Sequence, residues 1–275
     1  NGISDFRSVR FMRMFLSDFE EDVVLRFGTL ELVRGDWRTY TQSLQGTENP
    51  DDDTTDFEVG AVNTQENPNY VMPPGIQLEE LYNNNTVIRQ NEQSLSMKVN
   101  DLEVKDARAV YKNISIDMLQ FKKMRMFIHA ENYNTADPSG TEYPFDDGDL
   151  SAFLRMGNDL TNNFYQIELP LSPSPNNTSL ATEVWPTKNE IDLPLDILKK
   201  IKASRIEGAV FSTDIAYFDV SEDGNFVEFT DIDTDGLPNT PINETTKYRI
   251  AIKGNPSLGS IRNLMLGIKN NSNAL

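Results

Sequence analysis

Hydrophobic and polar side chains alternate along much of the chain, which is typical of β-strands that are buried on one face. In the segment SLSMKV, Leu95, Met97 and Val99 share one phase, while two serines and a lysine occupy the other. Residues 8–33 show a similar pattern in VVLRFGTLELV. The same alternation recurs at residues 124–129, 150–156, 165–169 and 248–253. The pattern therefore predicts a mainly β protein.

One short helix is expected between Pro194 and Lys202. Ile197, Leu198 and Ile201 form an apolar stripe at helical spacing, and the proline suits the first turn of a helix, preceded by Asp192 or Leu193 at the cap. Many short strands separated by turn residues, with a single helix, favour antiparallel β-sandwiches of the jelly-roll kind.

A short internal repeat suggests that the chain contains two related units. The tetrapeptide MRMF occurs at Met12–Phe15 and again at Met124–Phe127, and each copy is followed by a strand that contains LRF or LRM. We therefore expect residues 1–45 to be the closing strands of a first β-sandwich unit and residues 86–275 to form a second, jelly-roll-like sandwich. Residues 46–85 are rich in Pro, Asn and Asp, which predicts an acidic linker. The alternative is that four residues match by chance.

The amino-acid composition disfavours several classes of binding partner and binding site. The 275 residues include 43 acidic and 25 basic side chains, a formal net charge of −18, which disfavours binding to nucleic acid or to anionic membrane surfaces. The chain has no cysteine, so disulfides and cysteine-ligated metal clusters are excluded. It has no apolar run as long as the roughly 18 residues of a membrane helix. Its start, NGISDFRSVRFM, does not resemble a signal peptide, so we expect an excised fragment of a larger protein.

The segment TDIDTDGLPNTPIN has the spacing of a calcium-binding loop. The predicted ligands are Asp231, Asp233, Asp235 and Asn239. Alternate side chains of a tight loop converge on one point, and Gly236 stands at the sixth, turn-forming position. The twelfth position is Ile242 instead of glutamate, so the site would be of the looser extracellular type, completed by Glu228 and Glu244. The alternative is a solvated acidic turn between two strands.

Catalytic motifs are absent from the sequence. His129 is the one histidine, close to Glu131, and no GxSxG, HExxH or P-loop motif occurs. A glycosidase would need two facing carboxylates in a cleft, and an abundance of acidic residues does not identify such a pair. We therefore predict that the chain is not an enzyme, has no catalytic residues, and binds no cofactor other than calcium.

Two tryptophans are candidates for stacking on sugars, as the aromatic residues of carbohydrate-binding sandwiches do. Trp185 precedes Pro186 in a long connection, so packing is the alternative role for it and for Trp37. A carbohydrate-binding, lectin-like module of a secreted or surface protein is accordingly the alternative function.

Several long phrases of the chain resemble the SprA/Sov family. They are VRFMRMFLSDFEEDVVLRFGTLELVRGDWRTY, NEQSLSMKVNDLEVKDARAVYKNISIDMLQFKKMRMFIHAE, DGDLSAFLRMGNDLTNNFYQIELPL, EVWPTKNEIDLPLDILKK and KYRIAIKGNPSLGSIRNLMLGIKN. This family is the outer-membrane translocon of type IX secretion and gliding motility in Bacteroidetes.

The resemblance implies a soluble, non-catalytic insertion of a large protein-secretion translocon. Its expected role is to shape or gate the pore and to dock partner proteins, namely other secretion-system proteins and secreted substrate proteins. The parent protein would lie in the outer membrane, with this insertion on the extracellular face; the periplasmic face is the alternative.

Overall fold

A computed structural model describes most of the chain beyond residue 35. The described residues are 24, 36–44, 54–78, 80–83, 86–89, 91–131, 145–175, 178–207, 210–211, 213–234, 236–243 and 245–272. The chain divides into two units, residues 1–35 and residues 36–275. In the first unit the structure describes Val24 alone, so the strands predicted for residues 8–33 lie outside the described residues.

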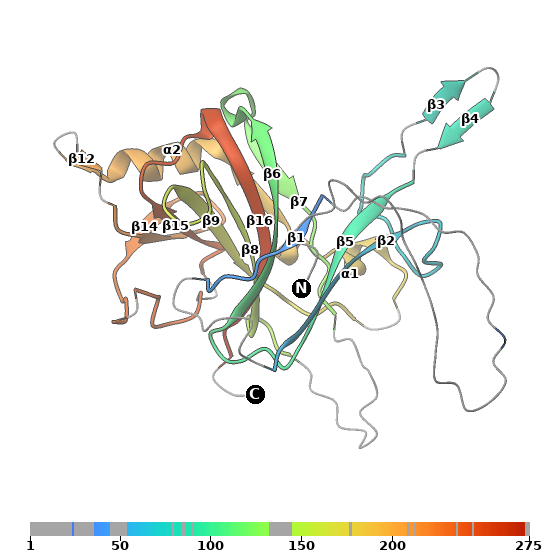
Figure 1. Ribbon diagram of the computed structural model, residues 1–275, viewed down its shortest axis with the longest axis horizontal. Helices are drawn as coiled ribbons and strands as arrows, with labels where there is room; N and C mark the ends of the chain where they lie inside the picture. Colours follow the sequence, from blue (N-terminus) through green and yellow to red (C-terminus); the bar gives the residue numbers. More distant parts are fainter. Residues whose placement is uncertain are drawn as a thin grey trace. The chain divides into compact units, whose positions relative to one another are not determined.

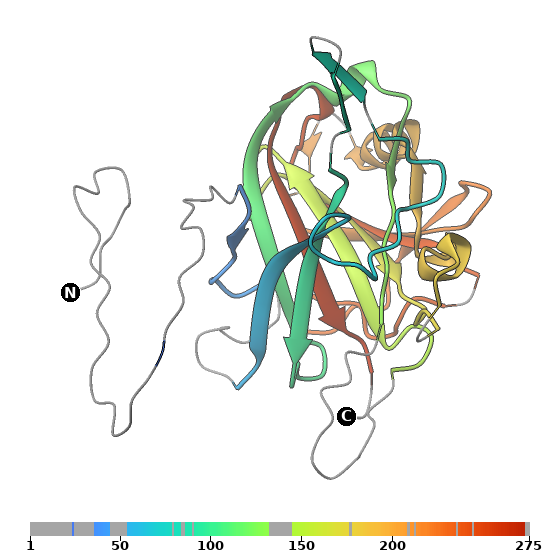
Figure 2. The ribbon, with the colours of Figure 1, turned by 90° about the vertical axis from the view of Figure 1, so that its right-hand side faces the viewer.

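An antiparallel sheet forms the framework of residues 36–275 (Figure 1). Its described strands, in spatial order, are β1 (Arg38–Thr39), β6 (Ala107–Ile116), β16 (Ile261–Asn270), β8 (Leu150–Gly157), β9 (Phe164–Pro170), β15 (Tyr248–Lys253), β13 (Ala216–Val220) and β14 (Phe226–Phe229). Figure 2 shows β6, β16 and β8 side by side, in green, red and yellow-green. The mainly β, antiparallel fold is confirmed, and the jelly-roll arrangement stays a prediction.

Smaller elements surround this sheet. Four further strand pairs are β2 (Asp56–Asn63) with β5 (Gln93–Asn100), β3 (Glu80–Asn83) with β4 (Thr86–Arg89), β7 (Lys123–Met126) with β10 (Ile191–Pro194), and β11 (Ile206–Glu207) with β12 (Val210–Phe211). The described helices are α1 (Ala181–Val184), α2 (Leu195–Ser204) and the 3₁₀ turns η1 (Met118–Gln120), η2 (Thr187–Asn189) and η3 (Leu258–Ser260).

Two boundaries differ from those that the sequence pattern indicated. Strands β2 and β3 lie inside the range 46–85, where the sequence predicts a linker, and β1 pairs with β6 of the large sheet. The predicted helix is α2, but it begins at Leu195, with Pro194 at the cap. Residues Ile191–Pro194 are extended because they pair with β7. The proposed division into two sandwich units stays a prediction.

The larger hydrophobic cluster lies on one face of the large sheet. The apolar stripe of α2 packs there against alternate residues of β8, β9, β15 and β13. The fully buried members of this cluster include Met156, Tyr165, Ile167, Leu198, Ile201, Ile250 and Ile252. Burial of each such side chain stabilises the fold by about 1.5–3 kcal/mol relative to exposure. The alternation in the sequence thus identifies the core-facing phase of these strands.

The opposite face of the sheet is also buried. It carries a smaller apolar cluster that includes Phe153 and Met265, and beside it the polar side chains for which we call it the polar face. Arg155 on β8 is only 6% exposed, and it donates hydrogen bonds to Gln166 Oε1 at 2.8 Å and to the carbonyl of Leu160 at 2.9 Å. Its guanidinium also lies 4.1 Å from the ring centroid of Phe164. Burial lowers the pKa of Arg155 to about 10, so the side chain still carries its charge at neutral pH. A polar position that alternates with core residues in these strands can therefore be buried as well, as Arg155 is.

A turn capped by Asp159 joins β8 to β9. Its Oδ1 accepts hydrogen bonds from the backbone N–H groups of Thr161 and Asn163, at 3.0 Å each, and its Oδ2 accepts one from Asn163 Nδ2 at 2.8 Å. Burial raises the pKa of Asp159, but the hydrogen bonds from Asn163, Asn162 and Thr161 outweigh burial and lower the pKa from 3.8 to about 2. The turn is thus held by the charged form of the carboxyl.

We expect Asp159→Asn to destabilise the fold at pH 7 and to matter less in acid. Because the folded-state pKa lies below the unfolded one, the contribution is complete above about pH 4 and is lost as the pH falls towards 2. Urea midpoints of the variant and the parent at pH 7 and pH 2.5 measure this, with exposed Asp223→Asn as the control. A difference that is equal at both pH values would contradict it.

Candidate functional site

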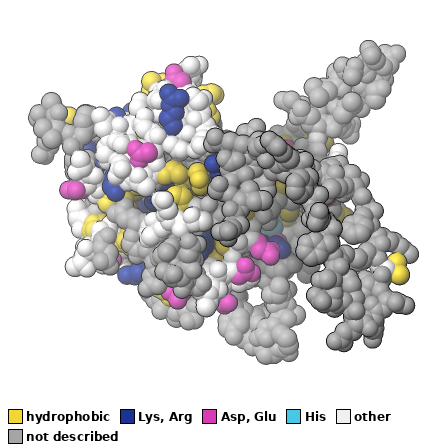
Figure 3. All heavy atoms as spheres, viewed as in Figure 1, with side chains coloured by type: hydrophobic (Ala, Val, Ile, Leu, Met, Phe, Trp, Pro, Cys, Tyr) yellow, Lys and Arg dark blue, Asp and Glu magenta, His cyan; other side chains and the backbone are white. Residues whose placement is uncertain are grey.

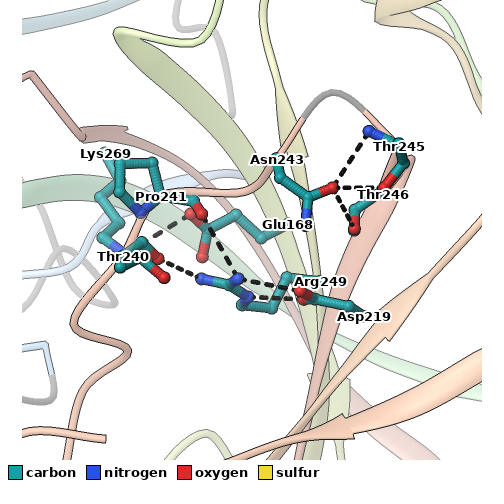
Figure 4. A network of polar contacts seen from close by, with 9 residues as sticks. All are labelled: Glu168, Asp219, Thr240, Pro241, Asn243, Thr245, Thr246, Arg249 and Lys269. Carbon is teal, nitrogen blue, oxygen red and sulfur yellow. Dashed lines mark hydrogen bonds and ion pairs between the residues drawn. The ribbon is translucent and has the colours of Figure 1, made fainter. Parts of the chain in front are cut away.

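A buried ion pair lies on the polar face, near the β14 edge of the sheet (Figure 4). Arg249 of β15 stands directly opposite Asp219 of β13 in the strand register. The guanidinium binds the carboxylate through two atoms, Nε to Oδ1 at 2.7 Å and Nη2 to Oδ2 at 3.0 Å. The two side chains are 4% and 16% exposed. This fork geometry is the strongest form of arginine–carboxylate contact.

Arg249 also holds the loop that follows β14 against the sheet. Its Nη1 donates to the carbonyl oxygen of Thr240 at 2.6 Å, and its guanidinium carbon lies 3.9 Å from the ring centroid of Phe229. Nearby, the hydroxyl of Tyr217 donates to the carbonyl of Gly236 at 3.2 Å. The 230–243 loop is therefore anchored at two points. We call Arg249, Asp219 and their loop contacts the arginine clamp.

Further polar contacts extend this network on both sides, as Figure 4 shows. Lys269 Nζ lies 3.4 Å from Glu168 Oε1, and Glu168 stands opposite Arg249 in the register. After the loop, Asn243 Oδ1 accepts hydrogen bonds from Thr245 N at 3.0 Å and from Thr246 Oγ1 at 3.0 Å. This amide closes the turn that leads into β15. The network thus fixes both the loop and its return to the sheet.

A groove of about 330 Å³ lies beside the clamp, at the edge of the sheet. It is lined by Asp219, Ser221, Asn225, Val227, Glu228, Phe229, Asn243, Thr245 and Thr246. Hydroxyls, amides and the carboxylate of Asp219 supply hydrogen-bond donors and acceptors, and Val227 and Phe229 add apolar surface. Such a lining suits a polar side chain. The arginine clamp fixes Asp219 in one wall of the groove.

Charged side chains are spread over the face of the molecule that Figure 3 shows. On that face, the acidic and basic side chains of the described residues are dispersed instead of gathered into a patch of one sign. The net charge of −18 is accordingly no guide to a single site.

The predicted calcium ligands lie in the loop that the clamp holds. Asp231 Oδ1 accepts a hydrogen bond from Asn239 Nδ2 at 2.8 Å, and Asp233 Oδ1 accepts one from Leu237 N at 2.9 Å. Asp235 lies outside the described residues. The structure brings Asp231 and Asn239 together in contact with each other, while Asp233 closes the turn.

The residues proposed to complete the calcium site are not both described. Glu228 lies on β14, where its charge raises the pKa of Arg205 against the larger, lowering effect of burial. Glu244 lies outside the described residues. Within the part of the chain that the structure describes, no three His, Asp or Glu residues are grouped to hold a metal ion. The calcium site stays a prediction.

Thermal unfolding in EDTA and then in added calcium checks that prediction. If the loop binds calcium, we expect the ion to raise the midpoint, because an ion that binds only the folded chain stabilises it. The Asp233→Ala variant should lose this rise, and Asp223→Ala, in an exposed turn outside the loop, is its control. An unchanged midpoint in the parent would leave the loop as a hydrogen-bonded turn.

His129 and the two tryptophans are engaged in packing. The His129 ring lies 5.7 Å from that of Trp185, and its Nε2 is 3.8 Å from Glu131 Oε2. Burial lowers the pKa of His129, and Glu131 opposes that shift. Trp185 is buried and donates its indole N–H to the carbonyl of Val71 at 2.8 Å, and Lys112 Nζ lies 4.6 Å from the Trp37 ring. The packing alternative for the tryptophans thus agrees with the structure.

The sequence analysis missed the arginine clamp. Arg249 occupies the polar phase of KYRIAIKG, which the alternation indicates only as facing away from the core. Asp219 is 30 positions earlier, and its pairing depends on β13 lying beside β15. The sequence contains one local sign of the clamp: Arg249 and Asp219 carry opposite charges, and each lies at a polar position of a strand whose alternate positions are apolar.

Comparison with known proteins gives a family for the whole chain. The SprA_N family model, described as a motility related/secretion protein, matches residues 1–275. No curated protein matches the chain. Among the described residues, no helix has both the length and the apolar character needed to cross a membrane. The match to the full sequence agrees with the resemblance noted from its longest phrases, and the chain belongs to the SprA_N family of motility-related and secretion proteins.

Proposed function

We propose that this chain is a non-catalytic module of a type IX secretion translocon, and that it docks partner proteins while shaping or gating the passage. Its partners would be other secretion-system components and secreted substrate proteins. Membership of a secretion and motility family supports this role. The observation that carries it is the groove at the sheet edge, beside the arginine clamp.

A groove whose walls are held by hydrogen bonds suits docking because little conformational freedom is lost when a partner binds. Arg249 and Asp219 fix the sheet side, and Asn243 fixes the turn that contributes Thr245 and Thr246 to the lining. The proposed location is the outer membrane, on the extracellular face, with the periplasmic face as the alternative.

The non-catalytic part of the proposal is supported by how the titratable side chains are engaged. Asp219 is bound to Arg249, Glu168 lies beside Lys269, and His129 packs against Trp185. A general acid or base must instead reach a substrate proton with a suitable pKa. Asp219, Glu168 and His129 instead contact other side chains of the fold, which favours a structural role for them.

The carbohydrate-binding alternative has less support from the groove. Sugar binding by such modules relies on aromatic faces that are open to the ligand. Phe229, the aromatic residue in the groove lining, has the Arg249 guanidinium against its ring. We therefore favour a protein partner.

The proposal is tested in cells whose secretion depends on the full-length protein. Asn225→Arg places a long side chain in the groove from an exposed turn position. We expect secretion of a substrate into the medium to fall, because the side chain occupies the docking space. Thr213→Arg, at an exposed position outside the groove lining, is the matched control.

Immunoblotting must show equal amounts of both variants in the envelope. Secretion that is unchanged by Asn225→Arg at normal protein level would overturn the proposed role of the groove. Loss with both variants would indicate a general effect of added charge and would count against the groove as well.

A further inference from the structure

The turn that follows β6 exposes three large apolar side chains within six residues. Ile116, at the end of β6, is 40% exposed, and Leu119 and Phe121, in and just after η1, are 54% and 56% exposed. In Figure 1 this is the green turn at the upper end of β6, beside the start of β16. Single exposed apolar residues are ordinary, whereas a group of them at one place marks a surface that contacts something other than water. We call residues 116–122 the apolar turn.

The apolar turn is anchored to the fold. Asp117 caps η1, since its Oδ1 accepts a hydrogen bond from the N–H of Leu119 at 2.9 Å. The N–H of Phe121 donates to the carbonyl of Met118 at 3.2 Å, and the Met118 side chain packs against the larger hydrophobic cluster. Met118 thus holds the turn from the inside, while Leu119 and Phe121 stay outside.

Basic side chains accompany the apolar ones. Lys122 ends the turn, and Arg262 Nη1 donates to Ser115 Oγ, next to Ile116, at 3.2 Å. Both basic residues are exposed, and of the carboxylates that the structure describes none forms an ion pair with either. The acidic residue of the turn, Asp117, is engaged in capping. Figure 3 shows hydrophobic and basic side chains together at this end of the molecule. The turn and its surroundings therefore carry a local positive charge.

The acidic turns of the sheet lie at its opposite end. Ile116 pairs with Ile261 at the start of β16, whereas Asn270, at the other end of β16, pairs with Leu150. The turns at that second end contain Asp146, Asp147, Asp149, Glu222 and Asp223. Strand β6 has ten residues and is therefore about 30 Å long, well beyond the Debye length of about 8 Å at physiological ionic strength. The net charge of −18 therefore does not decide what the apolar turn binds.

We propose that the apolar turn binds the surface of a phospholipid bilayer. Leu119 and Phe121 enter the boundary between headgroups and acyl chains, and Lys122 and Arg262 meet the headgroup phosphates. Basic side chains suit this place because their stems lie along apolar surface while their charges stay at the headgroups. A protein partner fits less well, since lysine is depleted at the centre of protein interfaces. This inference goes beyond the docking function and does not depend on the groove.

Co-sedimentation of the 275-residue chain with lipid vesicles tests this inference. The probe is vesicles of equimolar phosphatidylcholine and phosphatidylglycerol. The double variant Leu119→Ser with Phe121→Ser should lower the ratio of bound to free chain at least about tenfold, because two half-exposed apolar side chains no longer leave water on binding. The matched control, Leu180→Ser with Val227→Ser, removes side chains that are 60% and 72% exposed but lie outside the apolar turn. It should leave binding unchanged, and an equal loss with both double variants would overturn the proposal.

A pair of charge reversals tests the role of the basic side chains. Lys122→Glu should weaken vesicle binding, because it places a negative charge among the headgroup phosphates. Lys188→Glu makes the same change in net charge at a 72% exposed side chain, 3.2 Å from Asp147 at the opposite end of the sheet, and should weaken binding less. Equal weakening would show that net charge governs binding in place of the apolar turn, and the proposal would be wrong.

A fluorescent label reports insertion directly and does not depend on a loss of binding. Because the chain has no cysteine, Leu119→Cys and Leu180→Cys each provide a single site for an environment-sensitive dye such as NBD. Vesicles should raise the emission of the dye and shift it to shorter wavelength at position 119, and leave it unchanged at position 180. No shift at 119, or the same shift at both positions, would contradict insertion of the turn.

The outcomes separate this inference from the docking function. If the parent chain does not bind vesicles, the lipid proposal is wrong, and the apolar turn is left as a surface for another protein. The effect of Asn225→Arg on secretion then still decides the role of the groove. If vesicle binding depends on the apolar turn while Asn225→Arg leaves secretion unchanged, the docking role of the groove alone fails.

Discussion

Removing the carboxylate of Asp219 with Asp219→Ala is expected to lower the free energy of unfolding by about 3–5 kcal/mol, the usual cost of breaking a buried ion pair. The variant leaves the Arg249 guanidinium, only 4% exposed, without the two contacts that it makes to this residue. It also loosens the clamp on the 230–243 loop. Urea unfolding at neutral pH, followed by tryptophan fluorescence, measures the change.

Two variants serve as controls for this loss. Glu222→Ala removes an 82% exposed carboxylate that lies 3.5 Å from Lys247, and it should change stability by less than about 1 kcal/mol. The double variant Asp219→Ala with Arg249→Met removes both charges and should recover part of the loss, because no unpaired buried charge remains. A double variant less stable than the sum of the single ones would contradict this explanation.

Replacing Gly267 with valine is expected to destabilise the fold by about 3 kcal/mol, at the upper end of ordinary overpacking costs. A Cβ atom at Gly267 would lie 2.2 Å from Phe153 Cζ and 2.7 Å from the carbonyl oxygen of Arg108. The first atom belongs to a buried ring and the second to the backbone of the neighbouring strand β6. Neither can move away without disturbing the sheet. The thermal midpoint should fall accordingly.

Gly60 offers a matched control, since it also lies in a strand but a Cβ there would meet no atom within 4 Å. Gly60→Val should be neutral or slightly stabilising, as valine favours strands. Combining Gly267→Ala with Phe153→Ala tests the steric cause, because it removes the ring that the new methyl group meets. Equal losses for Gly60→Val and Gly267→Val would show that space is not the deciding factor.

Local patterns were sufficient to predict several elements. The alternation at 150–156, 165–169 and 248–253 corresponds to β8, β9 and β15, and the apolar stripe within 194–202 corresponds to α2. These succeed because core burial on one face imposes a period that is visible within a few residues. The order of the strands is not local: β15 pairs with β9 and β13, and no pattern in KYRIAIKG specifies those neighbours.

The polar phase of the same strands was harder to interpret. Arg155 and Arg249 alternate with core residues exactly as exposed arginines would, yet both are buried under other parts of the chain. The candidate site depends on this second burial, because the clamp forms only when the 230–243 loop crosses the polar face. For the acidic loop, spacing indicated a calcium site, whereas the contacts of Asp231 with Asn239 depend on how the loop folds back. Sequence spacing does not resolve that choice.

Strand β16 is the last strand in the described sequence but lies between β6 and β8, inside the large sheet. During synthesis, β6 and β8 are therefore made well before the strand that joins them. Until Ile261–Asn270 emerges, the sheet remains in two parts with an open slot, and each part exposes the unpaired side of a strand. Formation of the complete sheet must await residues close to 270, so a nascent chain remains unfinished and prone to association until then.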